Sequence, residues 1–66
     1  MGAAALLQIA LGFLPMIQVG VEDFITWLET LRAAAKQDGE WTAEHDDAFV
    51  AAVLAKKNDP AYQPHQ

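Results

Sequence analysis

The chain has 66 residues, nine of them acidic and four basic, so its net charge is −5, and it contains no cysteine. This length allows one domain with a small core. The acidic balance argues against nucleic-acid binding, which needs a basic surface. The missing cysteines exclude disulfides and thiolate metal sites.

The first segment, residues 3–37, is predicted to form one long helix. Its apolar residues recur in alternating steps of four and three from Ala3 to Ala35. This spacing is typical of a heptad seam that keeps one face against a partner helix. Pro15 allows a kink, because proline lacks the backbone N–H that a helix interior uses. A second apolar row widens the face beside the seam: Leu6, Phe13, Trp27 and Ala34.

The two halves of this segment differ in polarity. Residues 22–37 are amphipathic, whereas residues 1–21 are almost entirely apolar, with nineteen uncharged positions from 3 to 21. A helix that is apolar all round is buried all round, in protein or in lipid. The stretch is also long enough to span a bilayer, which leaves a single transmembrane helix as the alternative. The unbroken register across Val21 favours burial against protein.

The heptad seam is the predicted interaction surface of the chain. We expect it to pack against copies of the same chain or against a larger protein assembly, since one short second helix cannot cover it. The partner contacts are assigned to seven residues of the seam: Leu7, Leu14, Ile17, Val21, Phe24, Leu28 and Leu31.

A second helix is predicted over residues 43–57. Gly39 is suited to the left-handed position just past the end of the first helix. Thr42 is an N-cap residue, acidic residues follow it, and Lys56 and Lys57 come in the last turn. This is the charge order that the helix dipole favours.

Together these segments predict an all-α helical hairpin that is oligomeric or bound to a partner. The single domain covers residues 1–58, with its second helix over residues 42–57. Residues 59–66 are punctuated by proline and have no periodicity, so we expect an extended or disordered tail there.

The chain offers no recognisable catalytic or metal-binding chemistry. The stretch DGEWTAEH is similar to half of a calcium-binding EF-hand loop, but Ala34, Lys36 and His45 occupy positions that require oxygen ligands. There is no serine, no cysteine and no glycine-rich phosphate loop. His45 and His65, the two histidines, lack partners at ligand spacing. We therefore expect no enzyme activity, no cofactor, no metal and no small-molecule substrate.

The layout resembles that of small helical proteins of tailed bacteriophages. The resemblance rests on the alanine-rich apolar start with a Leu-Pro pair, the amphipathic helix, and the Gly-x-x-Thr-x-Glu turn into a short helix. It implies a non-enzymatic structural subunit, a minor component of the virion, found in the particle or the host cytoplasm. The alternative that it implies is a small single-span protein of holin type in the inner membrane.

Overall fold

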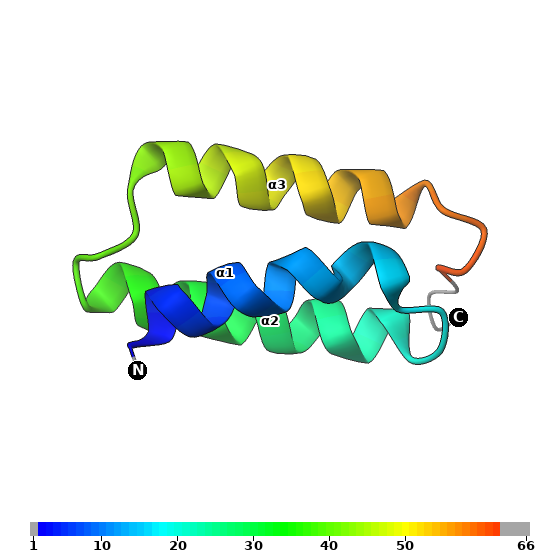
Figure 1. Cartoon of the computed structure of the whole chain (residues 1–66), viewed down its shortest axis with the longest axis horizontal. Helices are drawn as coiled ribbons and strands as arrows, with labels where there is room; N and C mark the ends of the chain where they lie inside the picture. Colours follow the sequence, from blue (N-terminus) through cyan, green and yellow to red (C-terminus); the bar gives the residue numbers. More distant parts are fainter. Residues whose placement is uncertain (1, 63–66) are drawn as a thin grey trace.

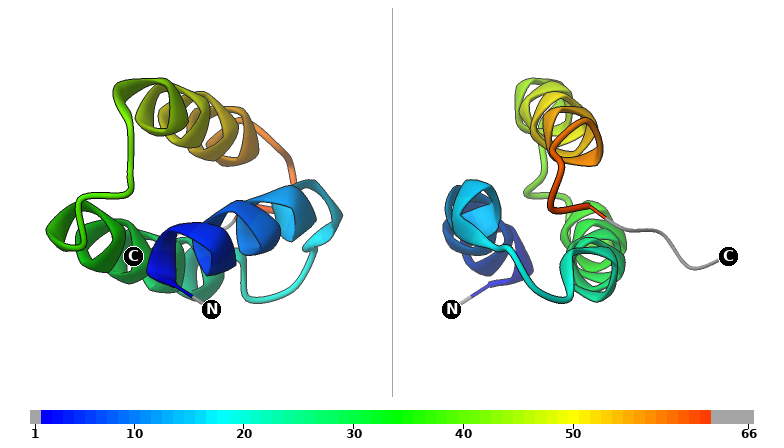
Figure 2. Two further views of the ribbon diagram at one scale, coloured as in Figure 1. Left: turned by 60° about the vertical axis from the view of Figure 1, so that its left-hand side comes forward. Right: turned by 90° about the vertical axis from the view of Figure 1, so that its right-hand side faces the viewer.

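Residues 2–62, the part of the chain that the computed structural model describes, form three α-helices and no strand. Helix α1 spans Ala3–Phe13, a short 3-10 helix η1 spans Leu14–Met16, α2 spans Val21–Gln37 and α3 spans Ala43–Lys57. Figure 1 shows α1 and α2 side by side and antiparallel, with α3 returning along the pair. Seen end-on in Figure 2, the three helices occupy the corners of a triangle. The molecule measures 33 × 20 × 18 Å.

The prediction of an all-α fold is confirmed, but the prediction of one long helix over residues 3–37 is wrong. The chain reverses between η1 and α2, so α1 and α2 form a hairpin of their own. Pro15 lies in the first turn of η1, Ile17 is extended with ψ 125°, and Gly20 is left-handed with φ 67°. The left-handed backbone conformation costs glycine little free energy, because glycine has no Cβ atom, whereas other residues are strained in it. In place of the kink that was expected at Pro15, the chain reverses its direction between η1 and α2.

The heptad seam survives this reversal because its period continues across the turn. The steps from Leu14 to Ile17 and from Ile17 to Val21 are three and four residues, as they would be within a helix. Both helices therefore present the same row of residues to one core, with the chain running in opposite directions. The periodicity of apolar residues indicates which residues face the core, but it does not indicate whether the chain continues straight or reverses its direction.

The core lies on the axis of the three-helix bundle. Its largest fully buried side chains come from every helix: Leu7 from α1, Leu14 from η1, Leu28 from α2 and Phe49 from α3. Smaller residues fill the space between them: Ala4, Ala10, Val21, Ile25, Ala35 and Val53. No buried side-chain nitrogen or oxygen in residues 2–62 lacks a hydrogen-bond partner.

Helix α3 has the predicted bounds, 43–57, and the predicted cap. The Thr42 hydroxyl accepts a hydrogen bond from the backbone N–H of His45 at 3.2 Å. In return, the Thr42 backbone N–H donates to Nδ1 of His45 at 3.4 Å, which completes a capping box. Gly39 has the predicted left-handed conformation, with φ 76°. The charged residues at both ends also follow the expected order, with Lys56 and Lys57 in the last turn.

An extended or disordered tail was predicted for residues 59–66, and the structure describes its first four residues, 59–62, as a turn. Asp59 begins a turn in which its carboxylate accepts from the N–H of Ala61 at 2.8 Å. Ala61 and Tyr62 then pack against the core. A side-chain carboxylate that bonds the backbone two residues on stabilises such a turn. Residues 63–66, including His65, lie outside the part that the structure describes.

The apolar stretch of residues 3–21 is divided among α1, η1, the loop and the first residue of α2. None of the helices in residues 2–62 is both long and apolar enough to cross a membrane.

Candidate interaction surface

An apolar groove of about 380 Å³ runs between α1 and α2 on their outer side. We call this surface the α1–α2 face, and it consists of Leu6, Ile9, Ala10, Phe13, Ile17, Phe24 and Trp27. Leu6, Ile9, Phe13 and Trp27 are 38–51% exposed. Scattered exposed apolar residues are normal, but a contiguous patch of them marks an interaction site.

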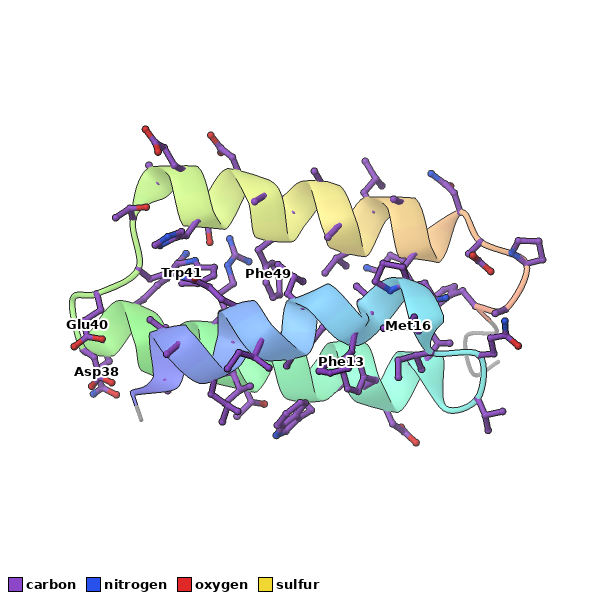
Figure 3. All side chains as sticks on the ribbon, in the orientation of Figure 1. Phe13, Met16, Asp38, Glu40, Trp41 and Phe49 are labelled. Carbon is purple, nitrogen blue, oxygen red and sulfur yellow. The ribbon has the colours of Figure 1, made fainter. Side chains whose placement is uncertain are left out.

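The position of the α1–α2 face follows from the triangular arrangement of the helices. Figure 3 shows Phe49 and Trp41 between α3 and the other helices, and Phe13 on the side of α1 turned away from α3. Helix α1 has apolar residues around its whole circumference and buries only the sides that meet α2 and α3. Its third side therefore has no neighbouring helix within residues 2–62.

Few polar groups interrupt the α1–α2 face. Helix α1 contains no charged residue. On the exposed part of α2, the Thr26 hydroxyl donates to the carbonyl of Glu22 at 3.0 Å, and the Thr30 hydroxyl donates to the carbonyl of Thr26 at 3.1 Å. Both hydroxyls are therefore satisfied within their own helix, and a protein that covers them would leave no unpaired donor.

Two aromatic side chains form one wall of the groove. The rings of Phe24 and Trp27 lie 5.5 Å apart between centroids, at an angle of 52°. Tilted aromatic pairs at this distance stabilise one another beyond their burial. Trp27 is consequently held in place while 43% of its surface remains exposed. A fixed, exposed tryptophan is a common anchor of protein interfaces.

The structure places the seven predicted contact residues mainly inside the chain. Leu7, Leu14, Val21 and Leu28 are buried in the core, each at most 2% exposed. Three others are half-buried and pack against that core: Ile17, Phe24 and Leu31. Of the seven, only Ile17 and Phe24 line the α1–α2 face. The seam therefore supplies the contacts between α1, α2 and α3.

The exposed residues of the face come instead from the second apolar row beside the seam. Leu6, Phe13 and Trp27 belong to that row, and Ile9 is one of the off-seam apolar residues of the first half. The sequence signal that marks the face is thus the width of the apolar stripe. Because the apolar stripe is wide, the seam residues along one of its edges are buried in the core, and the apolar residues along its other edge remain exposed once the chain turns back at Gly20.

A polar cluster joins α2 to α3 on the opposite side of the bundle. Arg32 donates to both carboxylate oxygens of Asp46 at 2.6 Å, and Nε1 of Trp41 donates to the same carboxylate at 3.0 Å. The Arg32 guanidinium also lies 5.1 Å from the centre of the Phe49 ring. Hydrogen bonds from Arg32, helped by Trp41, hold the pKa of the Asp46 carboxyl well below its usual range, against the effect of burial.

This cluster is best explained as a tie between helices. Three side chains of the described residues converge on Asp46: Arg32, Trp41 and Lys36, the last at 3.7 Å. Two further ties hold α3: the side chains of Gln8 and His45 are hydrogen-bonded at 3.1 Å, and buried Lys56 donates to the Pro15 carbonyl at 3.4 Å. Together they attach α3 along its length to α2, α1 and η1.

Neither the arrangement of potential metal ligands in residues 2–62 nor comparison with known proteins points to a second functional site. Within residues 2–62, no three His, Asp or Glu side chains are grouped so that they could hold a metal ion. No protein-family model matches the sequence, and neither a curated protein nor a solved structure is similar to it.

Proposed function

We propose that this chain is a non-enzymatic structural or assembly subunit that packs against other protein through the α1–α2 face. The observation that carries the proposal is the contiguous, charge-free surface formed by Leu6, Ile9, Phe13 and Trp27. Together with neighbouring Met16, which is 66% exposed, these side chains leave roughly 500 Å² of apolar surface in water, at the upper end of what monomers tolerate.

Protein is a better cover for this face than an anionic membrane surface. Membrane-surface helices combine an apolar face with lysine and arginine beside it. Helix α1 has neither residue, and the basic residues of α2, Arg32 and Lys36, line a separate surface with Glu29. The net charge of −5 would also repel anionic lipid headgroups.

The resemblance to small helical proteins of tailed bacteriophages supplies the biological setting of the proposal. In that setting the chain is a minor component of the virion, present in the particle or in the host cytoplasm before assembly. The setting is tested by mass spectrometry of particles banded in a density gradient. Recovery of the chain in constant ratio to the major particle proteins supports it, and absence of the chain from such particles refutes it.

The use of the α1–α2 face is tested by gradient sedimentation of the chain from cells that produce it. Phe13→Asp places a charge on the face, and Leu54→Asp places one on α3 at a side chain of similar exposure, 58% against 51%. We expect wild type and Leu54→Asp to sediment with a large assembly, and Phe13→Asp to lose at least tenfold of that fraction. Equal behaviour of the two variants would refute the proposal.

A further inference from the structure

We propose that the α1–α2 face is covered by a second copy of this chain, in a two-fold dimer. The two α1–α2 hairpins would stack face to face into a four-helix arrangement, with each α3 on the outside. This inference rests on the proposed function and names the partner of the same surface. Three features of the described residues favour a second copy.

The first feature is the distribution of charge. Each chain carries a net charge of −5, so an interface between two copies is tolerable only where charged groups are absent from it. Helix α1 has no charged residue, and none of the residues that line the groove is charged. Glu29, Arg32 and Lys36 of α2 lie together on another surface. Two copies can therefore meet along this groove without burying an unpaired charge, which would be strongly unfavourable.

The second feature is the area of the face. A specific interface buries at least about 500 Å² on each partner, or about 1,000 Å² in total. Together with neighbouring Met16, the exposed apolar side chains of the face reach roughly that value, and they represent about a tenth of the 4446 Å² accessible surface. Chains of this size commonly need such added burial, because a single small core stabilises them only marginally.

The third feature is the chemistry and shape of the face. Homodimer interfaces are more apolar than interfaces with transient partners, and a typical protein interface also has about ten hydrogen bonds. The threonine hydroxyls of α2 are already paired within the helix, so the face offers few groups for polar recognition. Its groove has Ala10 between the larger side chains of Phe13 and Trp27. In a two-fold contact, a ridge of each copy can enter the groove of the other.

The dimer is tested first with the wild-type chain by sedimentation equilibrium and tryptophan fluorescence. We expect a mass of twice 7.2 kDa at high concentration and of one chain on dilution. Over the same range Trp27, now 43% exposed, should lose water contact, so its emission should shift to shorter wavelength on association. Trp27→Phe removes the emission of that residue and so identifies the source of the shift, because Trp41 lies between α2 and α3.

Two charged substitutions on different helices then locate the interface. Phe13→Asp on α1 and Trp27→Lys on α2 should each weaken dimerisation by at least a hundredfold while circular dichroism retains the helical signal. Leu54→Asp on α3 should leave it within a factor of about three. A dimer broken only by Leu54→Asp, or formed without any change in Trp27 emission, would overturn the assignment of the face.

The outcomes separate this inference from the proposed function. A wild-type chain that remains monomeric at hundreds of micromolar overturns self-pairing. If that monomer still enters a large assembly in a manner that depends on Phe13, the assembly function stands and the face is bound by a different protein. If it neither dimerises nor enters an assembly, both proposals fail.

Discussion

Truncation of Phe49 tests how α3 is held to the rest of the bundle. The side chain is 2% exposed, and burial of about 200 Å² of aromatic surface at about 25 cal/mol per Å² corresponds to about 5 kcal/mol. Core Phe→Ala substitutions cost about 3–5 kcal/mol, and alanine's better helix propensity returns only about 0.5. A domain of this size has a free energy of unfolding of only about 3–10 kcal/mol. Phe49→Ala should therefore remove most of the stability of the chain.

The assay is urea denaturation followed by circular dichroism at 222 nm, at one fixed protein concentration. Leu54→Ala is the matched control, because it truncates an apolar residue of the same helix that is 58% exposed. We expect the control to change the free energy of unfolding by less than about 0.5 kcal/mol. Similar midpoints for the two variants would show that α3 is not held by the core contact of Phe49, and the reasoning would fail.

Three further predictions concern the ends of the helices and the polar tie. Gly20→Ala should destabilise the chain by about 1–2 kcal/mol, because Gly20 has φ 67° with open space around it, so that the cost comes from the backbone conformation. Gly12→Ala lies inside α1 and should instead stabilise the chain by about 0.5–1 kcal/mol. Equal thermal midpoints of the two variants would contradict this difference. Thr42→Ala removes the cap of α3 and should cost about 1 kcal/mol in urea unfolding. Asp46 has a lowered pKa in the folded chain, so its contribution to stability is complete above its ordinary pKa of 3.8 and is lost as the pH falls below that value. Asp46→Asn should therefore reduce the dependence of the free energy of unfolding on pH in this acid range. An unchanged dependence would refute the stabilising role of the Asp46 carboxylate.

The polar ties of α3 bear on how the proposed dimer would respond to these changes. Arg32, Gln8 and Lys56 hold α3 on the side of the bundle away from the α1–α2 face. Removal of one tie should lower the stability of each chain and leave the composition of the face unchanged. Stability and association are therefore separable by mutation, which makes Asp46→Asn a useful control in the association assays beside the surface variant Leu54→Asp.

The sequence predicted those elements whose signals are local. Thr42 and the acidic residues after it predicted the start of α3, because caps and dipole interactions act within one turn of a helix. Gly39 predicted the end of α2, since a left-handed residue there needs glycine. The seam predicted the buried residues Leu7, Leu14 and Leu28, because burial follows helical periodicity regardless of which neighbour provides it.

Chain reversal and surface exposure were decided only by the tertiary structure. Residues 17–20 occupy as many positions as one helical turn, so the apolar pattern is the same whether the chain continues straight or turns back at Gly20. Once it turns back, α2 and α3 cover the seam, and the apolar residues beside it are exposed on the other side of α1. The stretch AAALLQIALGFLPMIQVGV thus determined how much apolar surface the chain must bury. Packing of the helices determined that Phe13 and Trp27 are among the apolar residues left exposed.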